Sequence, residues 1–185
     1  DQGAAAIADA LRGNKVLKTL DLEFNSIRAE GAAAIAEALR GNGVLNNLDV
    51  RSNDISGDAA QQLATAVLAS STLELFGSVP LKELRANTLD RLDLSHEYLG
   101  VPEALVLAKL VEGSAVLKTL NLNFNKIGVE GAKAIGRALE VNGVLTNLDL
   151  SANGISDEGT AAIAEALRGN GVLTDLNLGY NQISD

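Results

Sequence analysis

Apolar residues recur along this chain with the spacing Leu-x-x-Leu-x-Leu, followed by an asparagine and an isoleucine, and the same eleven-residue pattern returns after 28 residues. Within Leu-x-Leu the apolar positions alternate, so the leucines point to one side of an extended segment and the residues between them point to the other. Each copy therefore predicts a short strand, and successive strands can stack as a parallel sheet with a spacing of about 4.8 Å. The five regular copies begin at Leu17, Leu45, Leu117, Leu145 and Leu173.

The segment before each strand has the apolar spacing of a helix, as in GAAAIAEALRGN. Ile35 and Leu39, four positions apart, share one face of this helix, whereas Glu37 and Arg40 lie on the other. The many alanines allow neighbouring helices to approach closely. Because helices are wider than strands, we expect the stacked units to curve, with the sheet on the inside.

The regular units span residues 3–30, 31–58, 103–130, 131–158 and 159–185, the last of which is one residue short of the 28-residue period. With these motifs the chain resembles leucine-rich repeat proteins of the ribonuclease-inhibitor type, a class that also includes the sensor arrays of NOD-like receptors and the Ran GTPase-activating protein. The resemblance implies an α/β leucine-rich repeat solenoid, a curved horseshoe segment with a parallel inner sheet and outer helices. We expect a single array over residues 1–185, with regular repeats at 3–58 and 103–185. Since both ends fall within a unit, we also expect a fragment of a longer array.

The repeat is broken over residues 59–102, which form an irregular double unit. We expect a helix over 59–68 and then two strand-like passages, 73–76 and 89–94, joined by a short helical turn that starts at Pro80. Together with the regular copies, these passages predict about seven strands in one continuous sheet.

The broken segment also collects residues that are rare in the rest of the chain, among them Phe76, Tyr98 and the only histidine, His96. Two interpretations remain open: aromatic side chains that fill the volume of a missing helix, or an irregular surface that binds a partner. A single histidine in a chain without cysteine does not form a zinc site, and no activated nucleophile can be assembled around it. We therefore predict no metal, no cofactor and no enzymatic activity.

Composition narrows the choice of partner. A net charge of −9 disfavours nucleic acid and anionic membranes, because both require a surplus of Lys and Arg. The sequence has no cysteine for disulfides and no apolar run of membrane-spanning length, so we expect a cytoplasmic protein without membrane insertion. The expected partner is another protein, and the chain could form part of a larger assembly.

The asparagine that follows each strand pattern is predicted to be structural. Its amide can satisfy inward-facing backbone groups of the turn and link one repeat to its neighbour. The predicted asparagine ladder consists of Asn25, Asn53, Asn125, Asn153 and Asn181.

The residues between the strand leucines should line the concave face. This face carries six acidic residues and two arginines, a net charge of −4, which suits a basic protein surface, although acidic side chains could also serve only to keep the solenoid soluble. In three of the five regular repeats an aromatic residue precedes the ladder asparagine; it should lie at the rim, where it either anchors a partner or packs over the adjacent loop. The predicted partner-binding residues are Asp21, Glu23, Phe24, Asp49, Arg51, Arg91, Asp93, His96, Asn121, Asn123, Phe124, Asp149, Asp175 and Tyr180.

These features predict a non-catalytic scaffold that binds a protein through the concave face and its rim. Two alternatives follow from the resemblance. One is a GTPase-activating regulator of a small GTPase, for which Arg51 and Arg91 are the concave arginines. The other is the sensor array of a NOD-like receptor, which needs a nucleotide-binding domain, and these residues contain no G-x-x-x-x-G-K-[ST] phosphate-binding loop.

Overall fold

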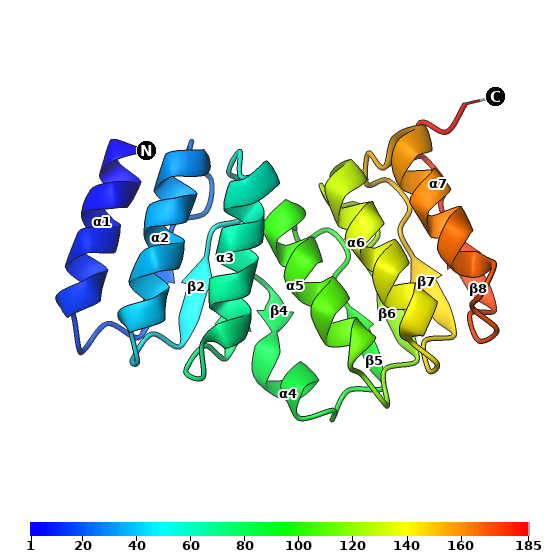
Figure 1. Cartoon of the computed structure of the whole chain (residues 1–185), viewed down its shortest axis with the longest axis horizontal. Coiled ribbons are helices and arrows are strands. Elements are labelled where there is room, and N and C mark those ends of the chain that lie inside the picture. The colour runs from blue at the N-terminus through cyan, green and yellow to red at the C-terminus, as the bar shows by residue number, and fades with distance from the viewer. Residues whose placement is uncertain (185) are drawn as a thin grey trace. The chain divides into compact units, whose positions relative to one another are not determined.

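The structure, a computed structural model, describes residues 1–184 and divides into two compact units, Asp1–Lys82 and Glu83–Asp185. In both units helices alternate with short strands along the chain (Figure 1). Residue 185, the end of the fifth predicted repeat, lies outside the described residues.

Three long helices, four short strands and the start of a fourth helix make up the first unit. Its elements are α1 (Gln2–Gly13), β1 (Thr19–Asp21), α2 (Ala29–Gly41), β2 (Asn47–Asp49), α3 (Gly57–Ala69), β3 (Leu75–Phe76), β4 (Val79–Pro80) and α4 (Leu81–Arg85). The last of these continues into the second unit, where it is followed by β5 (Arg91–Asp93), α5 (Val101–Glu112), β6 (Thr119–Asn121), α6 (Gly128–Val141), β7 (Asn147–Asp149), α7 (Ser156–Leu167) and β8 (Asp175–Asn177).

The strands pair with a constant register. In the first unit β1, β2 and β3 are parallel, and Leu20, Leu48 and Phe76 lie opposite one another. In the second unit β5 to β8 are all parallel, and each residue pairs with the residue 28 positions further along the chain, as Leu120 does with Leu148. The predicted α/β architecture of stacked strand and helix units is therefore confirmed.

The irregular segment differs from the prediction. Gly77, with a left-handed φ of 55°, and Ser78 form a tight turn that pairs β4 antiparallel with β3. Pro80 lacks an N–H group, and proline is tolerated on edge strands of this kind. The residues described thus contain two four-stranded sheets, where the sequence predicts about seven strands in a continuous one. The short helix α4 begins at Leu81, directly after Pro80.

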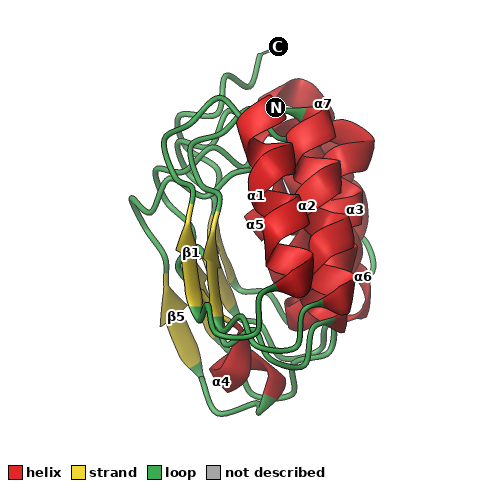
Figure 2. Cartoon of the chain, turned by 90° about the vertical axis from the view of Figure 1, so that its left-hand side faces the viewer, coloured by secondary structure: helices red, strands yellow, loops and turns green. Residues whose placement is uncertain are grey.

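Each unit consists of a strand layer and a layer of long helices (Figure 2). The central leucines of the strands, such as Leu48 and Leu148, are buried in the core between the layers. Neighbouring helices pack side by side: α1 with α2 and α2 with α3 in the first unit, and α5 with α6 and α6 with α7 in the second. At Gly136 of α6 a β-carbon would lie 2.9 Å from the backbone oxygen of Ala162, so this close helix contact requires glycine.

The aromatic residues of the broken segment are divided between core and surface. Phe76 is fully buried in the first unit. His96 and Tyr98 are exposed in the second unit. The segment therefore contributes one aromatic side chain to packing and two to the surface.

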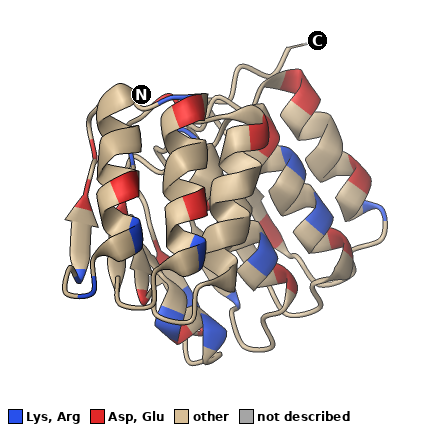
Figure 3. Cartoon of the chain, turned by 60° about the vertical axis from the view of Figure 1, so that its left-hand side comes forward, with Lys and Arg blue, Asp and Glu red and all other residues tan. Residues whose placement is uncertain are grey.

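The helices carry charges of both signs (Figure 3). Several form exposed pairs one turn apart, such as Arg40 with Glu37 at 2.7 Å and Lys109 with Glu112 at 2.6 Å. Exposed pairs of this kind stabilise a protein only slightly. Over residues 1–184, none of the helices has both the length and the apolar character needed to cross a lipid bilayer.

Candidate functional site

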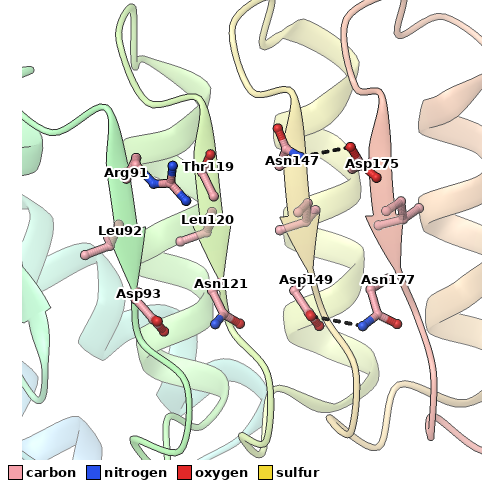
Figure 4. A pocket seen from close by; sticks show the side chains of 12 residues that line it. Arg91, Leu92, Asp93, Thr119, Leu120, Asn121, Asn147, Asp149, Asp175 and Asn177 are labelled. Carbon is pink, nitrogen blue, oxygen red and sulfur yellow. Dashed lines mark hydrogen bonds between the residues drawn. The ribbon is translucent and has the colours of Figure 1, made fainter.

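An open groove of about 530 Å³ runs across strands β5 to β8 (Figure 4). We call this surface the strand face of the second unit. It carries one guanidinium group and three carboxylates, so its formal charge is negative. The residues that flank the central leucines of the strands in this groove are Arg91, Asp93, Thr119, Asn121, Asn147, Asp149, Asp175 and Asn177.

Hydrogen bonds between neighbouring strands fix several of these side chains. Asn147 donates to Asp175 at 3.0 Å, and Asn177 donates to Asp149 at 2.9 Å (Figure 4). The buried hydroxyl of Ser151 also donates to Asp149. Because these groups are already oriented, a partner that binds them loses less side-chain entropy.

The third residue of each regular strand, and of β5, is Asp or Asn, and it has a structural role that sequence reasoning missed. One side-chain oxygen accepts a hydrogen bond from the backbone N–H two residues further on, at 2.8–3.0 Å. This local bond mimics a backbone turn and ends the strand. The residues concerned are Asp21, Asp49, Asp93, Asn121, Asp149 and Asn177.

Asp93 is an acidic group of the strand face whose pKa is lowered. The main cause is the backbone N–H of Ser95, which donates to the carboxylate at 3.0 Å. The hydroxyl of Ser95, the amide of Asn121 and the nearby charge of His96 lower the pKa further, and desolvation opposes them. The carboxylate is therefore charged at neutral pH.

In the first unit, Arg51, which is one of the predicted partner-binding residues, makes several contacts within the chain. The guanidinium of Arg51 contacts both oxygens of Asp49 at 2.6–3.0 Å, the hydroxyl of Ser78 at 2.7 Å and the carboxylate of Glu23 at 3.3 Å. The side chain of Arg51 is only 16% exposed. This geometry makes Arg51 a bridge from β2 to the β3–β4 turn. Asp21 is exposed at the end of β1.

In each unit, the residues that directly precede the ladder positions form a row beside the strands, which we call the rim. Every member of the row has a left-handed backbone, with φ between 51° and 60°. Phe24, Phe124 and Tyr180 expose 62%, 56% and 90% of their surface. The rings of His96 and Phe124 stack with centroids 4.7 Å apart. The row comprises Phe24 and Ser52 in the first unit, and His96, Phe124, Ala152 and Tyr180 in the second.

The ladder asparagines connect neighbouring repeats. Each side-chain amide in the second and later positions donates to one backbone carbonyl of the preceding repeat at 2.8–2.9 Å and to another in its own repeat at 2.8–3.0 Å. These residues are Asn53, Asn125, Asn153 and Asn181. Asn25 is exposed and donates to two carbonyls of its own repeat. Asn123, two residues before the ladder residue Asn125, donates to the hydroxyl of Ser151 in the next repeat at 2.6 Å.

A second set of asparagines lies at the C-terminal ends of the helices, and sequence reasoning missed it. Each amide donates at 2.7–2.9 Å to a carbonyl near the end of the helix in the preceding repeat. Each side-chain oxygen accepts two backbone N–H groups of its own repeat at 2.8–3.0 Å. These are Asn42, Asn142 and Asn170. The available signal was an Asn-x-Val-Leu sequence that recurs with the 28-residue period.

Comparison with known proteins identifies the repeat. A family profile described as Leucine Rich repeat matches residues 13–36, 113–136, 141–164 and 169–185. No curated protein matches this chain significantly. Two similar solved structures are "Leiomodin-1 Actin-Binding Site 2", with 16% identity, a TM-score of 0.43 and coverage of 96% of this chain and 78% of that chain, and the tropomodulin C-terminal domain of Caenorhabditis elegans, with 13% identity, a TM-score of 0.42 and coverage of 96% and 83%.

The matched repeats and the parallel strand register together define the class of protein. The chain contains leucine-rich repeats and has an α/β leucine-rich repeat fold. Among residues 1–184, no group of three or more His, Asp and Glu side chains is arranged to hold a metal ion. The candidate site is the polar strand face of the second unit together with the exposed aromatic residues beside it.

Proposed function

We propose that this chain is a non-catalytic scaffold that binds a protein partner through the strand face of the second unit and the aromatic row beside it. The observation that carries the proposal is the combination of an open groove of about 530 Å³ with rim aromatics that are more than half exposed. Exposed aromatic side chains bury a large area at small entropic cost when a partner covers them, and they frequently dominate binding energy.

The charge of the strand face supports a partner with a basic surface. Asp93, Asp149 and Asp175 outnumber the single guanidinium of Arg91 in the groove lining. Charges of this kind steer encounter and discriminate among partners more than they raise affinity. The same charges repel the phosphate backbone of nucleic acids.

The ribonuclease-inhibitor type of repeat is part of the same proposal. The regular units have a period of 28 residues, and each of α1, α2, α6 and α7 has 12 to 14 residues. A full helix in every regular unit is the feature that the resemblance to this class implies.

Site-specific photocrosslinking tests the proposed function. A benzoylphenylalanine placed at Asp175, which is exposed on the strand face, should crosslink a protein partner in an extract of the native cell. The matched control is the same group at Glu165, which is exposed on the outer side of α7. The crosslinked band at Asp175 should disappear when Phe124 and Tyr180 are changed to alanine.

Two results would contradict the proposal. Crosslinks of the same proteins from Asp175 and from Glu165 would show that the strand face is no more a binding surface than the helices are. A strong Asp175 crosslink that is unaffected by the double alanine variant would remove the rim from the binding site.

A further inference from the structure

Four turn residues of the second unit occupy equivalent places along the rim: His96, Phe124, Ala152 and Tyr180. All four have a left-handed backbone, with φ between 53° and 60°. The backbone N–H of each of the first three donates to the next repeat at 2.9–3.0 Å. Their side chains therefore start from the same backbone geometry, one repeat apart.

The first two members fix the spacing of this row. The rings of His96 and Phe124 are stacked with an interplanar angle of 11° and a centroid distance of 4.7 Å. This distance equals the usual separation of neighbouring strands, about 4.8 Å. The third member is the small residue Ala152, so the backbone of Tyr180 follows that of Phe124 after two strand spacings, roughly 9.5 Å. Between the two aromatic positions, the turn at Ala152 carries only a methyl group.

Folding does not account for the aromatic residue Tyr180. A bulky residue in the left-handed region is disfavoured relative to glycine or asparagine. Tyr180 is 90% exposed, so burial of its ring does not compensate. Ser52 and Ala152 adopt the same turn with small side chains. The ring of Tyr180 is therefore available for a contact outside the chain.

We propose that the space above Ala152 binds the guanidinium group of an arginine on the partner, stacked between the rings of Phe124 and Tyr180. This inference rests on the proposed function, since it assumes a protein partner. A guanidinium is planar and permanently charged, and it stacks on aromatic faces, whereas a lysine ammonium has no plane to stack.

Charge selects the guanidinium over other planar groups. Asp149 and Asp175 lie on the adjoining strand face, and the whole chain has a net charge of −9. A cation already contacts an aromatic ring elsewhere in the second unit, because the ammonium of Lys126 lies 5.9 Å from the centroid of the Tyr98 ring. A nucleobase would also stack, but its phosphate would be repelled by the same carboxylates.

Titration of the labelled full chain with short peptides tests the inference. The probes are acetyl-Gly-Ser-Arg-Ser-Gly-amide and the same peptide with citrulline, which keeps the planar shape and removes the charge. Nuclear magnetic resonance should show shifts of the Ala152 methyl group and of the Phe124 and Tyr180 rings. The arginine peptide should saturate them at a concentration about tenfold lower than the citrulline peptide, as expected for a cation between two rings.

A variant that fills the space provides the second measurement. Ala152→Leu should abolish the shifts of the two rings, because its side chain occupies the position of the guanidinium. The matched control is Ser52→Leu, which introduces the same side chain at the equivalent turn of the first unit, where φ is 53°. Thermal unfolding of both variants should give similar changes, and the control should leave the shifts unchanged.

The results separate this inference from the proposed function. Equal binding of the arginine and citrulline peptides, tighter binding of a phenylalanine peptide, or unchanged binding by Ala152→Leu would each overturn the inference. If a partner still crosslinks at Asp175 in that case, the proposed function stands without an arginine between the rings. Absence of both the crosslink and the shifts would overturn both.

Discussion

Replacing the ladder residue Asn153 by alanine should destabilise the second unit more than any change at an exposed asparagine. Asn153 is 2% exposed, and its amide donates to the carbonyls of Leu122 at 2.8 Å and Leu150 at 3.0 Å. Each buried hydrogen bond contributes about 1 kcal/mol, and the buried backbone N–H of Ile127, which donates to the side-chain oxygen of Asn153 at 3.4 Å, would lose its acceptor at a further cost of 1–3 kcal/mol or so. The expected loss of unfolding free energy is therefore about 3 kcal/mol.

The control is Asn25→Ala at the same position of the first repeat. Asn25 is exposed, and its amide donates to the carbonyls of Leu22 at 3.0 Å and Glu23 at 3.1 Å. Water can replace the lost donor at this surface, and Leu22 still accepts a bond from Asn53. The expected loss is below about 1 kcal/mol.

Urea denaturation distinguishes the two variants. Far-ultraviolet circular dichroism follows both units, and tyrosine fluorescence follows the second alone, because Tyr98 and Tyr180 are the only tyrosines and both lie in it. With a slope of about 2 kcal/mol per molar urea, a loss of 3 kcal/mol lowers the midpoint by roughly 1.5 M. Equal midpoints for Asn153→Ala and Asn25→Ala would refute the reasoning that the amide links repeats through buried carbonyls.

Three further changes test other parts of the structure. Gly136→Ala should lower the free energy of unfolding by about 1–3 kcal/mol, because the new β-carbon would lie 2.9 Å from the backbone oxygen of Ala162. The control is Gly41→Ala, whose new β-carbon would have no neighbouring atom within 4 Å. This control should be neutral or slightly stabilising in the same urea experiment. The lowered pKa of Asp93 adds stability that is present above the pKa of an unfolded aspartate, about 3.9, and is lost as the pH falls through the folded value. In the Asp93→Asn variant, the urea midpoint should therefore fall less as the pH is lowered below about 4. If the midpoint falls as steeply as in the parent protein, the contribution assigned to Asp93 is wrong. Tyr180→Gly should leave the thermal midpoint within about 2 °C of the parent, because it relieves a left-handed conformation and removes no buried surface; a larger fall would show that the ring stabilises the fold.

The period of the sequence was sufficient to predict the strand register. Each parallel pair of the second unit joins residues 28 positions apart, because the same alternation of leucines must face the helices in every repeat. The hairpin of β3 and β4 could not be predicted in this way. It depends on the left-handed turn at Gly77 and on the contact of Ser78 with Arg51, and a local pattern of apolar residues contains neither.

The candidate site was less accessible to sequence reasoning than the fold. Alternation identified which residues flank the central leucines, and these residues line the groove of the second unit. It did not reveal that Arg51 is enclosed by Asp49 and Glu23, because the pairing depends on the rotamers of three side chains on two strands and the adjoining turn. Nor could it show that His96 stacks on Phe124, since this contact follows from the shared turn geometry of adjacent repeats.

The strand-ending turns separate the charge of the strand face from the requirements of the fold. The side-chain oxygens of Asn121 and Asn177 each accept a backbone hydrogen bond at 3.0 Å. Asp93 and Asp149 accept the equivalent bond. The turn therefore needs a side-chain oxygen at this position but does not need a negative charge. Since an asparagine would end the strand equally well, the turn does not account for the negative charges of Asp93 and Asp149, and these charges can serve a contact outside the chain.

Exchange of aspartate for asparagine at these positions can consequently remove charge while the fold is kept. If the acidic strand face selects a basic partner, Asp149→Asn should slow association and weaken its dependence on salt, with little change in the dissociation rate. Asp149 also accepts from Asn177 and Ser151, and asparagine retains one acceptor oxygen, so a measured urea midpoint is needed alongside the kinetics. An association rate that does not respond to this exchange would leave the aromatic row, and not the carboxylates, as the source of selectivity.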